Sequence, residues 1–295
     1  MSAAHEAIAV NVDAANPGQF FACCGLLEFA GRMHPDALGW FTENEFHISG
    51  AGTLESLVEA IVKSELIQTE KYNNTSSRIW VVPPKAARLD RWKDIWESIV
   101  QGDNKESERV KDRADGFLLD WWHEARSGGR ELKVWAGKME SLRIAMAMQQ
   151  ALKHSTCRTS DLFDYGDVVF EPDNRGKKVE PFYFDSRRGP NAHSRDVGFA
   201  PNDLDLKSTA FPAVEFLCLV GLQRVLPKRV PGQPRTYEYT TWREPVPMEL
   251  APLFASHRVP PATLRGYRFE NWYRTGQKKH KAFLPAVPVS LRDDR

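Results

Sequence analysis

Two segments of this chain are apolar on every side, and they constrain its fold more than any other feature. The first starts at Asn16 and Pro17, reads FFACCGLLEFA and runs to about Met33. The second starts at Pro212, reads AVEFLCLVGLQRV and ends before Pro227. Asn caps helices well and Pro is favoured at the first helical position, so both segments are predicted to be helices. A helix without a polar face must be surrounded by protein, and we expect both helices at the centre of the fold.

The two apolar helices also resemble each other. Aligning Gly25 with Gly221 places Phe20 on Phe216, with small or apolar residues between them. Each helix follows a predicted strand, so the similarity suggests two copies of a strand–helix unit. The alternative is that any two buried helices share apolar residues. The two glycines are predicted to allow close packing of a helix on a sheet.

Strands and helices are interspersed along the chain, which predicts an α+β or α/β fold. The spacing of apolar residues gives the individual elements. Strands are predicted at 7–13, 40–48, 117–122, 132–135, 236–242 and 266–273, a hairpin at 167–170 and 181–185, and amphipathic helices at 54–63, 89–99 and 138–153. We divide the chain into an N-terminal half with a helical insertion, 1–155, and a basic C-terminal half, 156–295.

The net charge of +1 hides an asymmetry along the chain. Residues 1–150 contain 17 Lys and Arg against 22 Asp and Glu, a net of −5. Residues 151–295 contain 23 against 17, a net of +6, and residues 221–290 contain 12 against 4, a net of +8. A basic C-terminal third suits contact with phosphates, and the alternative is an ordinary solvated surface.

Several classes of protein are disfavoured by what the sequence lacks. It contains none of the motifs GxxxxGK[ST], GxGxxG, HExxH or GxSxG. The eight histidines are scattered and the four cysteines form no CxxC, so no metal, cofactor or disulfide scaffold is predicted. No run approaches the roughly 18 apolar residues of a membrane helix, and the start lacks the features of a signal peptide. We therefore expect a cytoplasmic protein without a membrane partner.

The first candidate binding segment is the polar, basic loop 185–196, which reads DSRRGPNAHSRD. Its planar arginine forks suit phosphate oxygens, and its Gly and Pro would let backbone approach a ligand closely. The alternative is a solvated loop in which Asp185 and Asp196 pair with the arginines. The candidate residues in this loop are Arg187, Arg188, His193 and Arg195.

The second candidate is the segment 265–281, RGYRFENWYRTGQKKHK, in which basic and aromatic residues alternate. Aromatic rings stack on unpaired bases while cations hold the phosphate backbone, a combination used by RNA-binding sheets. The alternative is an edge strand with its aromatic residues in the core. The candidate residues are Arg268, Trp272, Arg274, Lys278, Lys279 and Lys281.

The third candidate is Lys133, Lys138 and Arg143, beside Trp135 at a predicted strand-to-helix junction. A helix N-terminus attracts anions. The alternative is a structural Trp with surface cations.

Four segments together resemble a known family: NVDAANPGQFFACCGLLEFA (11–30), LKVWAGKMESLRIA (132–145), PFYFDSRRGPNAHSRDVGF (181–199) and FPAVEFLCLVGLQR (211–224). Their order and spacing are similar to the third Csb family of type I-U (or I-G) CRISPR systems. The resemblance implies an accessory member of the RAMP superfamily, with two RRM-like ferredoxin halves and helical insertions, in or beside the complex that carries a guide RNA. A departure is that no RAMP-type glycine-rich loop is visible near the C-terminus.

The sequence therefore predicts a non-catalytic, RNA-contacting subunit of the interference complex. The expected partners are the CRISPR guide RNA, other Cas subunits and, less directly, target DNA. One alternative is a metal-independent ribonuclease that processes precursor RNA, with His193 as base and Arg188 or Arg195 stabilising the developing charge. Another is a protein-interaction subunit without RNA contact.

Overall fold

The computed structural model describes residues 7–72, 76–84, 116–126, 128–135, 139–188, 209–258, 264–274 and 280–290. Its α-helices are α1 (Pro17–Met33), α2 (Leu54–Lys63), α5 (Gly129–Leu132), α6 (Ser141–Ala151), α8 (Pro212–Arg224) and α9 (Ala251–Ala255), with short 3-10 turns at η2 (Trp121–His123), η3 (Ser155–Arg158) and η4 (Ser186–Arg188). Its strands are β1 (Ile8–Asn11), β2 (Leu38–Phe41), β3 (Glu45–Ser49), β4 (Glu65–Tyr72), β5 (Ser76–Val82), β6 (Phe117–Leu119), β7 (Phe170–Glu171), β8 (Asn174–Lys178), β9 (Lys228–Arg229), β10 (Thr236–Trp242), β11 (Leu264–Tyr273), β12 (Lys281–Phe283) and β13 (Val287–Val289). The predicted α+β class is confirmed.

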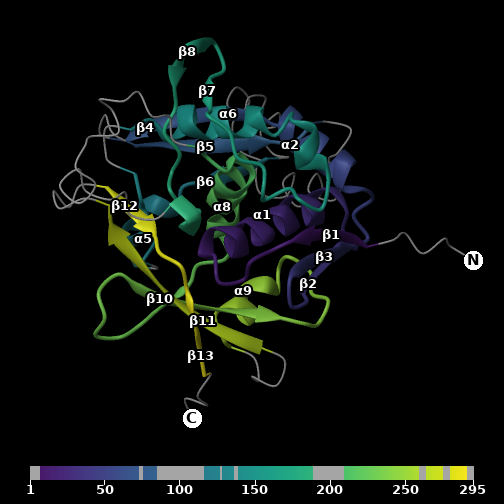
Figure 1. Ribbon diagram of the computed structural model, residues 1–295, viewed down its shortest axis with the longest axis vertical. Coiled ribbons are helices and arrows are strands. Elements are labelled where there is room, and N and C mark those ends of the chain that lie inside the picture. The colour runs from purple at the N-terminus through teal and green to yellow at the C-terminus, as the bar shows by residue number, and fades with distance from the viewer. Residues whose placement is uncertain are drawn as a thin grey trace, which may run out of the picture.

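The two apolar helices, α1 and α8, cross each other at the centre of the molecule (Figure 1). A Cβ atom added to Gly25 would lie 2.0 Å from the carbonyl oxygen of Leu217. One added to Gly221 would lie 1.9 Å from the carbonyl oxygen of Phe21. The glycines therefore let one helix backbone touch another, and the predicted packing of each glycine on a sheet is wrong.

The contact between the two helices is reciprocal. Each glycine meets the residue four positions before the other glycine. Glu28, three residues after Gly25, accepts a hydrogen bond of 3.0 Å from Nη2 of Arg224, three residues after Gly221. The surroundings of the helices differ, because α8 packs on α6 and β6 whereas α1 packs on α2, β2 and β3. These different surroundings do not support a duplication of a strand–helix unit, which stays a prediction.

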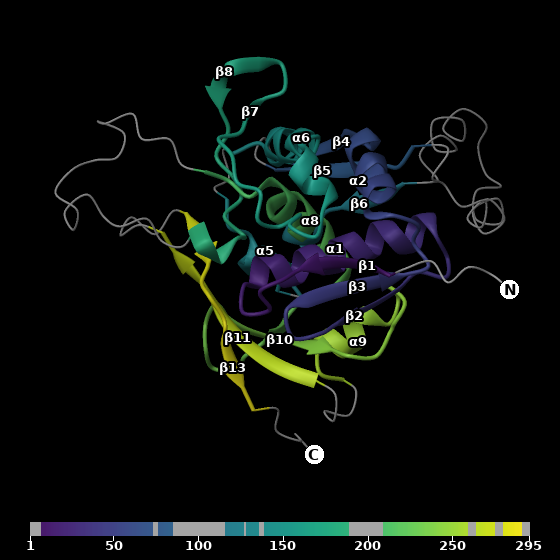
Figure 2. The same cartoon turned by 45° about the vertical axis from the view of Figure 1, so that its right-hand side comes forward.

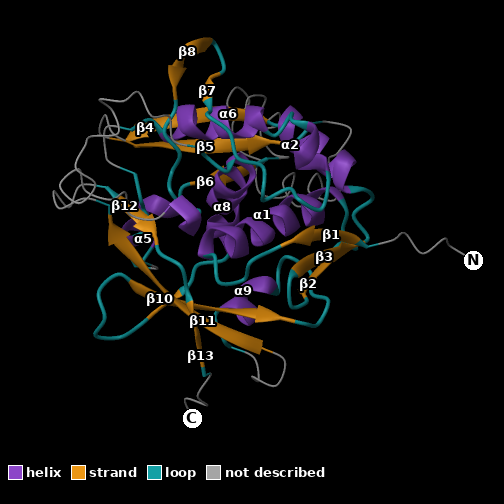
Figure 3. Ribbon diagram, in the orientation of Figure 1, coloured by secondary structure: helices purple, strands orange, loops and turns teal. Residues whose placement is uncertain are grey.

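The helix pair lies between two sheets (Figures 1 and 3). On one side is the antiparallel sheet β4-β5-β6, which is covered by α6. On the other is the antiparallel C-terminal sheet β12-β11-β10-β9, in which β13 also pairs with β11. The ring of Phe20 in α1 stacks on Tyr239 of β10 at 4.3 Å, and Phe29 meets Phe117 of β6 at 5.5 Å. One hydrophobic core thus includes residues from both sides of position 155.

The N-terminal strands form a third antiparallel sheet with the order β1-β3-β2. The predicted single strand 40–48 is wrong, since it is a hairpin of β2 and β3. The chain turns at FTENEF, where the backbone N–H of Thr42 donates to the carbonyl oxygen of Glu45 at 2.9 Å. Strand β3 lies between β1 and β2, and α1 is the crossover between these two outer strands.

Two further predictions fail for backbone reasons. Residues 132–135 do not form a strand. The short helix α5, whose N-cap Gly128 has a left-handed φ of 82°, includes Leu132 and ends there. The predicted hairpin of 167–170 and 181–185 is also wrong: the turn comes earlier, and Asn174–Lys178 forms strand β8 opposite β7. Figure 2 shows this β7–β8 hairpin projecting from the body. Pro181 has no backbone N–H, and Tyr183 has a φ of 73°, so neither suits a regular strand.

Most of the other predicted elements agree with the structure. Helix α1 begins at Pro17 with the side chain of Asn16 accepting from the backbone N–H of Gly18, and α2 begins after a capping box at Thr53. Strand β10 has its predicted bounds, and β1 and β11 differ from theirs by at most two residues at either end. The predicted helix 89–99 lies outside the described residues. In the part of the chain that is described, no helix is long and apolar enough to cross a membrane.

Candidate nucleic-acid interface

Strand β12 brings the three candidate segments together. It pairs with β11 at Asn271–Tyr273. The backbone N–H of Lys281 donates to the carbonyl oxygen of Val134 at 3.1 Å, and that of Phe283 donates to the carbonyl oxygen of Tyr183 at 3.2 Å. Residues about 100 and 150 positions apart therefore meet at one end of the C-terminal sheet, where β12 lies beside α5 in Figure 1. We call this end of the sheet the β12 end.

Three cations gather at the β12 end: Lys133, Arg235 and Lys281. Nζ of Lys281 donates to the carbonyl oxygen of Glu131 in α5. Burial lowers the pKa of Lys281 to about 8; the charge of Glu131 opposes this shift, and those of Arg235 and Lys133 add to it. Burial, with the nearby Arg130, also lowers the pKa of Lys133. Both ammonium groups thus lie close to other positive charges, and Lys281 is still protonated at neutral pH.

An exposed aromatic residue lies beside one of these cations, Arg235. The guanidinium carbon of Arg235 lies 4.8 Å from the ring centre of Trp272 and 4.9 Å from that of Tyr273. Trp272 is 43% exposed, although most large apolar residues of the structure are buried. An exposed indole next to a cation is suited to stacking on an unpaired base.

A second group of cations surrounds Tyr183. The guanidinium carbon of Arg274 lies 3.4 Å from the ring centre of Tyr183, and that of Arg188 lies 5.3 Å from it. Nε and Nη2 of Arg188 and Nε of Arg274 are buried and have no hydrogen-bond partner among the described residues. We call these three residues the Tyr183 site.

The segment that carries Tyr183 and Arg188 is fixed between the first turns of α1 and α8. The side-chain oxygen of Asn16 accepts from the backbone N–H of Ser186 at 3.1 Å, and its amide donates to Asp185 at 2.9 Å. The carboxylate of Glu215 in α8 accepts from the backbone N–H groups of Phe184, at 3.3 Å, and of Asp185, at 3.2 Å. We call Asn16, Asp185, Arg187 and Glu215 the interior junction.

Burial governs the protonation of Glu215 in the interior junction. It is fully buried, and this desolvation raises its pKa to about 7. The charge of Asp185 raises the pKa further, while the backbone N–H donors act in the opposite direction. The side chains of Asn16 and Glu215, which are far apart in the sequence, both hold this loop in place by hydrogen bonds to its backbone.

Arg187 belongs to the interior junction and not to the β12 end. Its guanidinium donates to Asp185 at 2.7 and 3.0 Å, to Asp164 at 2.9 Å and to the carbonyl oxygen of Phe163 at 2.6 Å. It also stacks over the ring of Phe211 at 3.5 Å. Most of the donors of Arg187 are therefore occupied. Its pairing with Asp185 is the alternative that the sequence left open for this loop.

Two more candidate cations lie elsewhere and are paired. Arg268 of β11 donates to Glu238 of β10 at 2.5 and 2.8 Å. Arg143 of α6 pairs with Glu171 at 3.1 Å and with Glu140 at 3.4 Å. The remaining candidates, His193, Arg195, Lys138, Lys278 and Lys279, lie outside the described residues.

The sequence reasoning missed Arg235 and Tyr183. Arg235 follows a Pro- and Gly-rich stretch, and it comes to the β12 end because β10 pairs with β11 in a register that places Thr236 opposite Glu270. That pairing of two predicted strands was the available signal for Arg235. Tyr183 lies in the apolar run PFYF, which reads as a strand, and nothing in the sequence indicates its positive φ.

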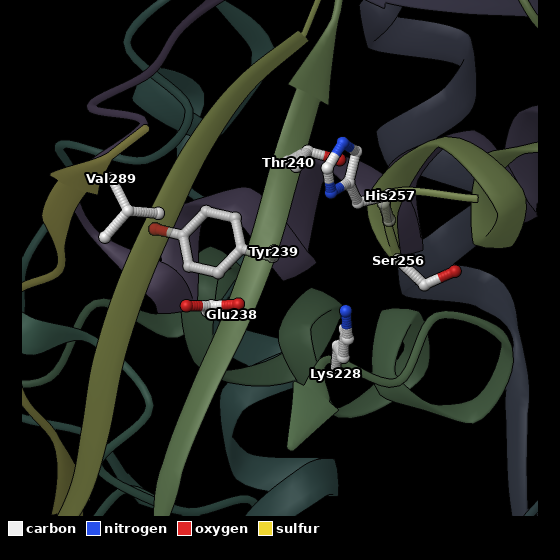
Figure 4. A pocket seen from close by; sticks show the side chains of 8 residues that line it. Lys228, Glu238, Tyr239, Thr240, Ser256, His257 and Val289 are labelled. Atoms are coloured by element: carbon white, nitrogen blue, oxygen red, sulfur yellow. The ribbon is translucent and has the colours of Figure 1, made fainter. Parts of the chain in front are cut away.

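The structure offers little for catalysis in the residues that it describes. They include no group of three or more His, Cys, Asp or Glu placed to hold a metal ion. Figure 4 shows a small pocket beside β10, lined by Lys228, Glu238, Tyr239, Thr240, Ala255, Ser256, His257 and Val289. Glu238 in this pocket is paired with Arg268, and the hydroxyl of Thr240 donates to the carbonyl oxygen of Phe254. The pocket therefore has few uncommitted polar groups for a substrate.

Comparison with known proteins gives this chain no relative: no family model, no curated protein and no solved structure matches it.

Proposed function

We propose that this chain is a non-catalytic, RNA-contacting subunit of the type I-U CRISPR interference complex. The observation that carries the proposal is the meeting of three distant candidate segments at the β12 end. There, Lys133, Arg235 and Lys281 lie close to one another, and Arg235 lies against the exposed ring of Trp272. Cations hold phosphates and an exposed aromatic ring stacks on an unpaired base, so the expected ligand is single-stranded RNA.

The guide RNA is proposed as the ligand because of the family resemblance. The start of the chain supports the same proposal. The order β1-β3-β2, with α1 as crossover, is the split β-α-β arrangement with which a ferredoxin-like fold begins. After α2, strand β4 pairs with β5 and leaves this sheet. A RAMP-like N-terminal half is therefore proposed for residues 8–63, with the later strands as an addition to it.

A salt-dependent binding titration tests the proposal. Labelled single-stranded repeat RNA is titrated with the wild type and with the double variant Lys133→Gln/Lys281→Gln at several salt concentrations. Each lost phosphate contact is expected to flatten the slope of log K against log salt by about 0.7. Arg143→Gln is the matched control, since it removes a cation of α6 that lies outside the β12 end.

Two results would contradict the proposal. Equal affinities and slopes for the wild type, the double variant and the control would remove RNA from the β12 end and favour an acidic partner subunit there. Cleavage of the RNA in the presence of EDTA would instead support the metal-independent ribonuclease.

A further inference from the structure

The Tyr183 site contains two arginines that form no salt bridge within the described part of the chain, although Glu180 is near enough for the charge of Arg188 to act on its carboxylate. Arg188 and Arg274 both approach the ring of Tyr183, at 5.3 and 3.4 Å, so both guanidinium groups lie against the same side chain. The carboxylate beside them is Glu180, which accepts from the hydroxyl of Tyr183 at 2.6 Å and pairs with Lys178 at 2.9 Å. No carboxylate of the described residues forms a salt bridge with either arginine.

The donors of these two arginines are buried as well as unmatched. Nε and Nη2 of Arg188 and Nε of Arg274 are out of contact with solvent, and no hydrogen-bond acceptor in the described part of the chain reaches them. Buried polar atoms in native proteins nearly always have a partner. An unsatisfied buried donor is unfavourable, and more so when the group is charged. Among the described residues, the site therefore lacks the acceptors that a ligand could supply.

The backbone of Tyr183 is strained where it meets the two arginines. Its φ of 73° is in the left-handed region, which is unfavourable for a residue with a Cβ. Two hydrogen bonds retain this conformation, from Phe283 N–H to the carbonyl oxygen of Tyr183 and from Phe184 N–H to Glu215. Strain of this kind gathers at ligand sites, and here it places the ring against both guanidinium groups.

We propose that Arg188 and Arg274 form a binding site for one phosphate group. A guanidinium that stacks on an aromatic ring uses its flat face, so its N–H groups lie in its own plane, where the ring does not occupy them. That planar fork matches two oxygens of a phosphate. Two such forks match the charge and the acceptor oxygens of a free phosphate, and the single charge and two non-bridging oxygens of a phosphodiester can accept from the same donors. A phosphodiester of RNA and a free phosphate share this chemistry.

The first test uses inorganic phosphate as the probe, at constant ionic strength set with chloride. Phosphate that binds only the folded chain raises the melting temperature of the wild type. We expect Arg188→Gln and Arg274→Gln to weaken phosphate binding at least about tenfold, and Arg143→Gln to leave it unchanged. Arg274→Lys keeps the charge but loses the planar fork, so it is expected to weaken binding as well and serves if Arg274→Gln does not fold. An equal phosphate effect in all variants, or no effect in the wild type, overturns the proposal.

A second measurement identifies the source of the phosphate. If the site holds an RNA phosphate, inorganic phosphate competes with labelled RNA, and Arg274→Gln weakens RNA binding. If Arg274→Gln removes phosphate binding and leaves RNA binding intact, the ligand is a separate phosphate-bearing molecule. The double variant Lys133→Gln/Lys281→Gln is expected to retain phosphate binding, so failure of the RNA proposal and failure of the phosphate site are distinguishable.

Discussion

Arg187 and Arg188 are neighbours in the sequence, yet they belong to two regions that treat charge in opposite ways. Arg187 lies in the interior junction, where Asp185 and Asp164 match its charge and a carbonyl oxygen takes another of its donors. Arg188 lies in the Tyr183 site, where two of its buried nitrogens have no partner among the described residues. In the interior junction the charge and the donors of the arginine have partners within the protein. In the Tyr183 site the buried donors have no acceptor among the described residues.

The comparison separates arginines that hold the fold from arginines that are free to hold a ligand. In the interior junction the buried side chains of Asn16 and Glu215 both form hydrogen bonds to the segment that carries Asp185. At the β12 end the cations adjoin other cations and aromatic rings. Composition alone does not make this distinction, because the interior junction and the Tyr183 site each take one arginine from the same short segment, DSRR.

The largest effect is expected where the interior is tightest. Gly221→Ala places a Cβ 1.9 Å from the backbone oxygen of Phe21, and a backbone atom has no rotamer by which to move away. Overpacking a core typically costs about 1–3 kcal/mol, and here we expect at least about 3 kcal/mol because two helix backbones must separate. Chemical denaturation measures it. Gly176→Ala in β8, where the nearest atom is the Asn174 side chain at 3.3 Å, is the control and should change stability little.

The second effect is a pH dependence that originates in the interior junction. Because the folded-state pKa of Glu215 is raised to about 7 from 4.5, the folded state retains a proton that the unfolded state releases. The stability contributed by this proton is fully present below pH 4.5 and is lost as the pH rises to about 7. The loss is on the order of a few kcal/mol.

Glu215→Gln tests this dependence because a glutamine carries no titrating proton. The difference in unfolding free energy between the wild type and the variant should fall across pH 4.5–7 and be constant above that window. A difference that does not vary with pH would show that Glu215 is ionised in the fold throughout. The interior junction would then contain two buried negative charges against Arg187.

How far the sequence predicted these regions depended on the range of the interactions involved. Local signals sufficed for α1 and α8, since Asn16, Pro17 and Pro212 mark their starts and their apolar faces require burial. The same signals did not show that Gly25 and Gly221 face each other, because helix–sheet and helix–helix packing demand the same small residue.

The candidate site was predicted as separate pieces but not as a whole. Lys133, Arg188 and Lys281 were chosen for their residue types, and only the pairing of β12 with residues 134 and 183 brings them together. The sequence alone does not distinguish Arg187 from Arg188, because they are adjacent residues of the same type. Their roles diverge because a single 3-10 turn directs one toward Asp185 and the other toward Tyr183.

A smaller effect, on binding rather than stability, is expected at the exposed ring of the β12 end. Trp272→Ala should weaken RNA binding by about 1–3 kcal/mol if the indole stacks on a base. The salt slope should stay nearly the same, since no phosphate contact is lost. Trp272→Phe retains an aromatic face and should recover much of the affinity. Equal binding by the Ala variant and the wild type would leave only the cations as RNA contacts.

The smallest loss of stability, and the sharpest test of the comparison, is at Arg188 itself. Arg188→Gln removes no hydrogen bond made by its Nε or Nη2 and relieves the burial of two unmatched donors, so the unfolding free energy without ligand should not fall, and an increase is the expected direction. Arg187→Gln is the matched variant one residue away. It breaks the pair with the fully buried Asp185, and we expect a loss of about 2 kcal/mol, below the 3–5 kcal/mol of a fully buried pair because Arg187 is partly exposed. Denaturation of both variants in phosphate-free buffer measures the contrast. Equal losses would mean that Arg188 stabilises the fold as much as Arg187 does. The distinction between the interior junction and the Tyr183 site as a ligand site would then not hold.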